Sequence, residues 1–484
     1  MKKKDWMEAY SRSLEAVTRI GEKLEFIIGF NVNIDAVRHV DKSVIEKLAS
    51  SASLSKVLGK ISDPPLRVES LEDFLAGLLV CIRDGIGEEW IITNERVSAE
   101  LERLLGWDER RMGGQGGNMS NVLARLGHRV VVNAPSLPKQ QAELFHSENI
   151  AIPVPTSGGI VFKHPREAVR PGDTPLIHWI SEFKKGFSVK LGDLFIEAPR
   201  DNRFIASFDD VNTRLLLAPG FREGSVMKAE DAAAAIVSGY HLLRETYPTG
   251  ETCESVIKQV RELISEWKKV NPELLIHAEM GFTSSCRVRK AILDAVFPRV
   301  DSVGFNEVEL RMFNSPDHTT FPASYSAPEL YLEAKSVLEK HNLKRVFVHT
   351  REYSMSILKQ EYGVNLEEEL ASLLFGALIA ATLASTGTPT LSSAREILRS
   401  KELTVCEDGI REHEKLALLL DSEGECGYES FLELGFAEGD PGVVFIPSLI
   451  SKRVKATVGL GDAICSATLA GESLLRRSSK LRSH

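Results

Sequence analysis

The cysteines of this sequence are not arranged in pairs. The chain has six of them among 484 residues and contains no C-x-x-C motif. They are Cys81, Cys253, Cys286, Cys406, Cys426 and Cys465. Scattered cysteines indicate neither a disulfide framework nor a zinc site, and they favour a reducing compartment. The basic start at 1–6 has no apolar core behind it, which predicts no secretory signal. We therefore expect a cytoplasmic protein.

The sequence also lacks a long hydrophobic run and a positive net charge. Its longest apolar stretch, 373–384, is too short and too rich in small residues to span a bilayer, so we expect a buried helix there. The formal net charge of -9 argues against nucleic acid as the main partner. We predict neither a membrane nor a nucleic-acid partner.

Two common phosphate-binding motifs are absent as well. The sequence has no P-loop of the form GxxxxGK[ST] and no complete GxGxxG, because the segment GGQGGNMS at 113–120 lacks the third glycine. Protein-kinase and Rossmann mechanisms are therefore disfavoured.

The length and patterning of the chain predict two lobes. A chain of 484 residues with 43% hydrophobic content is too long for one ordinary core. From 232 onward, predicted strands and helices alternate, which indicates a parallel sheet covered by helices. In 151–215, short strand-like pieces, including 160–163, are separated by turn residues, and we expect a small, mainly antiparallel sheet there.

Polar residues follow successive predicted strands, at the edge where open α/β sheets bind ligands. They are Asn33, Asp35, Gly114, Gln115, Asn118, His277, Glu279, Asn306, Glu307, Glu309, His349 and Asp462. Structural alternatives exist: Asn33 and Asp35 could cap a turn, 306–309 could be a helix start with favourable acids, and His349 could be a core histidine. For the glutamates, the functional alternative is Mg²⁺ held through waters.

The segment TVGLGD at 457–462 carries the strongest local signal. Its glycines allow backbone N–H groups to converge on an anion at a helix N-terminus. Asp462, beside that anion, could accept a proton from a hydroxyl that attacks a phosphoryl group. The alternative is a strand-to-helix turn with an aspartate N-cap.

Six motifs in a fixed order give the chain a family resemblance. GFNVNIDAV, RMGGQGGN, HAE, GFNEVEL, VHT and TVGLGD follow one another from 29 to 462. Together they resemble the ADP-dependent sugar kinases of archaea, glucokinase and phosphofructokinase, in the ribokinase-like superfamily. The resemblance implies an α/β fold, whose large domain has a central, mostly parallel sheet flanked by helices, and a smaller α+β lid domain inserted in it. It also implies Mg²⁺ and implies ADP as phosphoryl donor.

The domain boundaries expected from this reading are 1–37, 112–155 and 213–484 for the large nucleotide-binding domain, and 38–111 with 156–212 for the lid over the sugar.

Residue roles follow from the resemblance. It implies that Asp462 is the catalytic base, that Gly459 and Gly461 form the anion hole, and that Arg203 faces the nucleotide phosphates. The implied metal ligands are Glu279, Glu309, Glu307 and Asp462. The implied sugar-binding residues are Asn33, Asp35, Glu89, Gly114, Gln115 and His178. The implied nucleotide-binding residues are Asn306, His349, Thr350, Val458 and Gly459.

The residues expected at the sugar favour glucose. Glu89 and His178 match the glucokinase branch, and 204–212 has acids where phosphofructokinases have an arginine. We therefore expect ADP-dependent phosphorylation of glucose at the 6-hydroxyl, giving glucose 6-phosphate and AMP in a modified glycolysis. Lys163, Arg170, Lys184 and Lys185 could bind a sugar phosphate, so a phosphofructokinase or a bifunctional enzyme stays open. A non-catalytic sensor, an ATP-using ribokinase-type enzyme, and a monomer or a homodimer also stay open.

Overall fold

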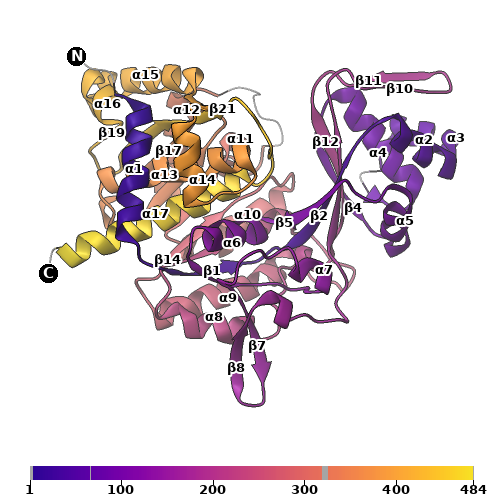
Figure 1. Cartoon of the computed structure of the whole chain (residues 1–484), viewed down its shortest axis with the longest axis horizontal. Helices are drawn as coiled ribbons and strands as arrows, with labels where there is room; N and C mark the ends of the chain where they lie inside the picture. The colour runs from indigo at the N-terminus through magenta and orange to yellow at the C-terminus, as the bar shows by residue number, and fades with distance from the viewer. Residues whose placement is uncertain (1–3, 66, 319–324, 483–484) are drawn as a thin grey trace.

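The computed structural model describes residues 4–65, 67–318 and 325–482. Two large sheets organise them (Figure 1). The larger sheet has eleven strands, in the order β19-β20-β17-β16-β15-β14-β13-β1-β6-β7-β8. The smaller has six, in the order β3-β4-β12-β9-β2-β5. The predicted α/β class is confirmed.

The larger sheet is mostly parallel, because its central strands are joined by helical crossovers. Neighbours from β7 to β16 run parallel, whereas β8, β17, β20 and β19 join their neighbours antiparallel. Its strands are β1 (Glu25–Gly29), β6 (Arg129–Val132), β7 (Ile150–Thr156), β8 (Gly159–Lys163), β13 (Ala234–Val237), β14 (Leu275–Glu279), β15 (Ser302–Phe305), β16 (Arg345–His349), β17 (Tyr353–Leu358), β19 (Phe436–Ala437) and β20 (Gly442–Pro447).

Helices cover both faces of this sheet, so the side chains of alternate residues in one strand point into two different hydrophobic cores. Ile27 of β1 packs into one core, while Phe26 and Ile28 pack into the other. The helices on the Ile27 side are α8 (Phe221–Ala229), α9 (Cys253–Val270), α10 (Cys286–Ala295), α11 (Glu307–Asn314), α12 (Ala327–Lys340), α15 (Glu407–Ser422) and α16 (Tyr428–Leu434). Those on the Phe26 side are α1 (Trp6–Ile20), α6 (Gln115–Arg125), α7 (Lys139–Ala142), α13 (Leu366–Thr386), α14 (Leu391–Arg399) and α17 (Leu460–Arg482).

The apolar run at 373–384 lies inside a longer helix than the run itself suggested. Helix α13 has 21 residues, and it is the one helix in the described residues that is long and apolar enough to cross a membrane. However, 72% of its apolar 18-residue window is buried inside the protein. At Gly376 an added Cβ would lie 2.7 Å from the Ile464 carbonyl oxygen, so α13 and α17 pack closely. The prediction of a buried helix is confirmed.

The smaller sheet carries helices on one face. Trp90, Trp179 and Phe204 point into the core between this sheet and its helices. The strands are β2 (Asn33–His39), β3 (Arg67–Val68), β4 (Glu88–Ile92), β5 (Glu109–Gly113), β9 (Ile177–Phe183) and β12 (Asn202–Phe208). The helices are α2 (Lys42–Ser51), α3 (Leu54–Ser62), α4 (Leu71–Asp84) and α5 (Glu95–Leu105). Two short antiparallel pairs complete the strands: the hairpin of β10 (Ser188–Leu191) with β11 (Leu194–Glu197), and the pair of β18 (Leu403–Val405) with β21 (Leu449–Ser451), which are far apart in the sequence.

The expectation of a small, mainly antiparallel sheet in 151–215 was wrong in two respects. The sheet is mixed, because β3–β4, β4–β12 and β2–β9 are parallel pairs. The helices at 42–105, which lie in the 38–111 part of the expected lid, supply the crossovers that parallel neighbours require. In addition, the piece at 160–163 belongs to β8, which pairs with β7 at the edge of the larger sheet.

Candidate active site

The carboxylate of Glu279 lies at the end of β14, between two histidines. Its Oε1 is 2.8 Å from His349 Nε2, at the end of β16, and its Oε2 is 3.1 Å from His277 Nε2. Burial alone would raise the pKa of Glu279, but the two imidazoles lower it to about 2. The structure therefore holds an ionised, buried carboxylate at the edge of the larger sheet.

The glycine turn before α17 lies beside this carboxylate. Gly459 has a φ of +75°, and an added Cβ would lie 3.3 Å from Asn118 Nδ2. At Gly461 an added Cβ would lie 3.1 Å from the His349 ring. The turn therefore requires glycine for backbone conformation at one position and for space at the other.

Asp462 sits in the first turn of α17, where its Oδ2 accepts a hydrogen bond of 2.8 Å from Asn118 Nδ2. Burial raises the pKa of Asp462 to about 6, and the nearby Glu279 adds to the rise. Such a group is ionised at neutral pH and can still take a proton at a low energetic cost.

The segment at 306–309 forms the predicted helix start and also places a carboxylate near Glu279. Asn306 caps α11 by accepting from the N–H groups of Val308 and Glu309. Glu309 returns the contact, with Oε2 2.9 Å from Asn306 N and Oε1 2.8 Å from Asn306 Nδ2. Burial raises the pKa of Glu309 to about 7. Both amide and carboxylate are thus committed to the capping box, and Glu307 stands half-buried beside them.

Thr350 and Val458 lie in two loops beside the site, and only Thr350 has a clear structural role. The Thr350 hydroxyl accepts from the N–H groups of Glu352 and Tyr353 and donates to the Tyr353 carbonyl at 3.0 Å. It therefore stabilises the turn between β16 and β17. Val458 is half-buried in the loop that leads into the glycine turn.

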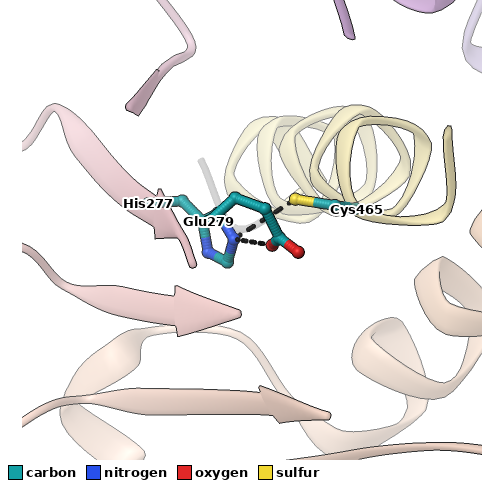
Figure 2. A group of neighbouring side chains, drawn as sticks. All are labelled: His277, Glu279 and Cys465. Carbon is teal, nitrogen blue, oxygen red and sulfur yellow. Dashed lines mark hydrogen bonds and ion pairs between the residues drawn. The ribbon is translucent and has the colours of Figure 1, made fainter. Parts of the chain in front are cut away.

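His277, Glu279 and Cys465 bring three metal-ligand atom types within 4.8 Å of one another (Figure 2). Cys465 Sγ comes from α17 and lies 3.2 Å from His277 Nε2. Burial raises the pKa of this thiol well above its ordinary value, so it stays protonated and is a poor metal ligand. His277 Nε2 already contacts Glu279, and we read the group as a hydrogen-bonded cluster.

The smaller sheet places a row of polar side chains on the face opposite its helices. Asp35 of β2 is level with His178 of β9, and His178 is level with Ser207 of β12. Ser207 donates a hydrogen bond to Glu89 of β4. Because Trp90, Trp179 and Phe204 point to the helical face, their neighbours in sequence point the other way.

Asn33 and Asp35 are buried where the chain passes from one sheet to the other. Asn33 Nδ2 donates to Asp35 Oδ1 at 2.8 Å. Asn33 Oδ1 is buried and has no hydrogen-bond partner among the described residues. An unpaired buried oxygen costs free energy, and a ligand hydroxyl would satisfy it. The turn-cap alternative does not account for this oxygen.

Gly114 and Gln115 fix the loop beside Asn33. Gly114 has a φ of +74°, and an added Cβ would lie 2.6 Å from the Asn31 carbonyl oxygen. The Gln115 amide is fully used: Nε2 donates to the Met280 carbonyl at 2.7 Å, and Oε1 accepts from Gly239 N at 3.0 Å. Gln115 therefore ties three loops of the larger sheet together.

Arg203 lies on β12, opposite Glu182 of β9. Its position two residues before Ile205 and four before Ser207 places it on the same face as the polar row. Within the described residues, its guanidinium makes no recorded hydrogen bond or ion pair. This cation is therefore available to an anion in front of the smaller sheet.

Three residues near the row were not selected from the sequence. Asp209 Oδ2 is 3.0 Å from His178 Nε2, His241 follows β13 with a buried, unpartnered Nδ1, and Arg111 lies 3.9 Å from Asp35. Asp209 was within the acidic segment at 204–212 and could have been found there. His241 and Arg111 reach the site through pairing between distant strands, which the local sequence does not reveal.

The contact between His178 and Asp209 predicts a pH-dependent stability. Burial lowers the pKa of His178, but Asp209 and Glu89 outweigh it and raise the pKa to about 9. Since this exceeds the value of about 6.5 for an unfolded histidine, the stabilisation is complete below about pH 6.5 and is lost as pH rises through 9. We expect the free energy of unfolding to fall by about 3 kcal/mol over that range.

Urea unfolding at pH 6.5 and pH 9.5 measures this loss. His178→Gln should flatten the pH dependence, whereas His39→Gln, at an exposed histidine near Glu182, should leave it unchanged. Equal slopes in the wild type and His178→Gln would contradict the assignment.

Comparison with known proteins places this chain in a family. A family model described as the ADP-specific phosphofructokinase/glucokinase conserved region matches residues 24–471. An ADP-specific phosphofructokinase of Methanosarcina acetivorans is 32% identical, covering 95% of this chain and 96% of its own length. An ADP-dependent glucose/glucosamine kinase of Pyrococcus abyssi is also 32% identical, covering 96% of this chain and 98% of its own length.

Solved structures agree with this placement. The last common ancestor of ADP-dependent phosphofructokinases from Methanosarcinales superposes with a TM-score of 0.84 at 31% identity, covering 98% of this chain and 99% of that one. An ADP-dependent kinase in complex with fructose-6-phosphate and ADPβS gives 0.83 at 30% identity, with the same coverage. This chain belongs to the ADP-specific phosphofructokinase/glucokinase family and is an ADP-dependent sugar kinase.

Proposed function

We propose that the enzyme phosphorylates glucose at the 6-hydroxyl, with ADP as donor and glucose 6-phosphate and AMP as products. Relatives named for phosphofructokinase and for glucose/glucosamine kinase are equally similar to it, so overall similarity does not choose between the sugars. The observation that carries the proposal is the row formed by Asp35, His178 and Glu89, with Asp209 behind His178.

The charge of this row favours a neutral sugar. Carboxylates accept hydrogen bonds from hydroxyls, but they repel a phosphate dianion. Three carboxylates, Asp35, Glu89 and Asp209, surround one imidazolium, that of His178. A glucose molecule would find several acceptors and one donor there, and the free Asn33 Oδ1 would add another acceptor.

Two of the four cations considered as a phosphate site bind other groups. Arg170 binds Asp173 and the Ala134 carbonyl, each at 2.7 Å. Lys184 Nζ binds Asp201, whereas Lys185 contacts Asp201 only through its backbone N–H, and Lys163 belongs to β8 of the larger sheet. Fructose 6-phosphate remains the second candidate because Arg111 and Arg203 stand near the row with incomplete partners.

Asp462 is proposed to accept the proton of the 6-hydroxyl as its oxygen attacks the β-phosphorus of ADP. The bond between that phosphorus and the bridging oxygen breaks, and AMP leaves. The N–H groups of the glycine turn at 459–462 would hold the developing charge, and Arg203 would approach from the smaller sheet.

We propose that the protein has two lobes with the boundaries expected from the sequence, except that the β7–β8 hairpin belongs to the large lobe. Closure of the two lobes over the substrates would exclude water.

The carboxylates near Asp462 suit Mg²⁺. Glu279, Glu307 and Glu309 offer only oxygen donors, and the pKa of Glu309 is raised to about 7, so a cation would favour its ionised form. Both oxygens of Glu279 and of Glu309 already accept hydrogen bonds, which suits contact through water. When bound, the ion would neutralise phosphate charge. Asn306, His349, Thr350 and Val458 would line the nucleotide side.

Steady-state kinetics that cross ADP and ATP with glucose and fructose 6-phosphate test this proposal. Activity with ADP and glucose and little with the other three combinations is expected. A kcat/KM for fructose 6-phosphate equal to or above that for glucose would establish the second candidate instead. Activity only with ATP would refute the donor, and no turnover with tight sugar binding would indicate a sensor.

Replacing Glu89 by glutamine should raise KM for glucose about 10-fold or more, as expected for a charged hydrogen bond worth roughly 1.5–3 kcal/mol. The adjacent Glu88 is the matched control, because its Oε2 accepts from Trp90 Nε1 at 2.8 Å on the helical face. Glu88→Gln should leave KM for glucose within about 2-fold. Equal changes in the two variants would place Glu89 outside the sugar site.

A further inference from the structure

A continuous chain of buried hydrogen bonds runs from the core to Glu279. Arg345, at the start of β16, donates from Nη1 to Ser302 Oγ of β15 at 3.2 Å. Ser302 Oγ is 2.9 Å from His277 Nδ1 of β14, and His277 Nε2 is 3.1 Å from Glu279 Oε2. All four side chains are buried, and they lie on three adjacent parallel strands.

The Glu279 end of the chain selects the direction of the bonds. The carboxylate only accepts, so the hydrogen of a neutral His277 is on Nε2. Arginine has donors and no acceptor, so Ser302 Oγ accepts from Arg345, and its own proton is free for His277 Nδ1. The two contacts of Ser302 are therefore compatible with this tautomer and hold the ring from the Nδ1 side.

Arg345 is held so that it cannot turn away. Its Nε and Nη2 donate to Glu369 Oε1 of α13 at 2.8 and 2.6 Å, and its Nε also donates to Ser356 Oγ of β17 at 3.0 Å. Arg345 and Glu369 are fully buried. A buried ion pair is weak evidence for stability but a strong constraint on geometry.

We infer that Arg345 and Ser302 are positioning residues, which fix the orientation of the His277 ring and thereby hold the Glu279 carboxylate toward the glycine turn. The other Glu279 oxygen binds His349, which packs against Gly461 (Figure 2 shows His277 and Glu279). If the hydroxyl of Ser302 is removed, the His277 ring loses its partner at Nδ1 and can tilt, so that Nε2 no longer points at Glu279. This tilt releases Glu279 and weakens cation binding, a role that rests on the proposed function.

The structure offers a matched pair of variants. Ser302→Ala breaks the chain between Arg345 and His277. Ser356→Ala also removes a buried serine contact to Arg345 but lies off the path to His277. Both should lower stability by a similar amount, whereas only the first should change the active site. Ser302→Thr keeps a hydroxyl and should restore the wild-type behaviour.

Two readouts test the inference without turnover. Mn²⁺ binding, followed by electron paramagnetic resonance with AMP present, should weaken about 10-fold in Ser302→Ala, the lower range for outer-shell partners of a metal site. It should stay within about 2-fold in Ser356→Ala and Ser302→Thr. Nitrogen NMR of histidine-labelled protein should show the His277 Nε2–H hydrogen-bonded to Glu279 in the wild type and a weakened Nε2–H hydrogen bond in Ser302→Ala.

The outcomes are distinguishable. Equal Mn²⁺ affinities in Ser302→Ala and Ser356→Ala, or an unchanged His277 Nε2–H signal in Ser302→Ala, would overturn the positioning role. If Glu279→Gln binds Mn²⁺ as tightly as the wild type, the proposed metal role fails. The NMR measurement still decides the positioning role in that case, because it requires no metal.

Discussion

Replacing Asp462 by asparagine should lower kcat by about 10² to 10⁴, the usual contribution of a general base. The amide keeps the size of the side chain but cannot accept a proton from the sugar hydroxyl. The hydrogen bond between Asn118 and Asp462 Oδ2 can be kept by the new carbonyl oxygen, so the turn should hold its shape. Steady-state kinetics with ADP and glucose measures the loss, and calorimetry should show that glucose still binds.

Asp408 provides the matched control for this variant. It is also an aspartate in the first turn of a helix, α15, but it is exposed and pairs with Arg411. Asp408→Asn should leave kcat within about 2-fold. Wild-type turnover in Asp462→Asn would remove Asp462 from the mechanism.

Replacing Gly304 by alanine should lower kcat/KM about 10²-fold, the cost of displacing a reactive group by roughly 1 Å. Gly304 lies on β15 directly opposite Glu279 of β14. An added Cβ would overlap Glu279 Oε2 and would lie 2.9 Å from His277 Nε2 and 3.0 Å from Glu279 Cδ. Because the carboxylate is buried between the two histidines, it cannot yield without losing one of these contacts.

The crystal structure or the Mn²⁺ affinity of Gly304→Ala would show whether Glu279 has moved. Gly59→Ala is the control, because an added Cβ at this exposed position in α3 meets no atom within 4 Å. That variant should keep wild-type kinetics. An unchanged kcat/KM in a folded Gly304→Ala enzyme would mean that the position of Glu279 does not limit the reaction.

Local sequence patterns predicted the main sheet and the edge at which the candidate site lies. Apolar runs in the sequence, such as 26–28, indicate a central strand. Polar residues that follow parallel strands must meet at the edge formed by the carboxyl ends of those strands. This is why Glu279, His349 and Asp462 could be expected together, and the structure brings them together. Their catalytic and metal roles remain predictions.

Contacts between distant strands could not be predicted in the same way. Arg345 and Ser302 each begin an ordinary apolar strand, and only the register between β14, β15 and β16 makes them neighbours of His277. Gln115 was expected to bind sugar because of its motif, yet its amide joins backbone groups of two other loops. The mixed pairing of the smaller sheet also depends on segments far apart in the chain.

The passage of the chain between the two sheets links sugar recognition to mechanics. Asn33 of β2 pairs with Gly113 of β5 at the end of the smaller sheet from which the chain runs to the larger sheet, so the atoms proposed to bind the sugar lie at the root of the strands that connect the two sheets. A rotation of one lobe against the other strains the backbone at this point. Because coupling between two equilibria acts in both directions, a ligand bound there changes the preferred angle between the lobes. We expect discrimination between sugars to depend on the elastic response of these strands as well as on the hydrogen bonds each sugar forms.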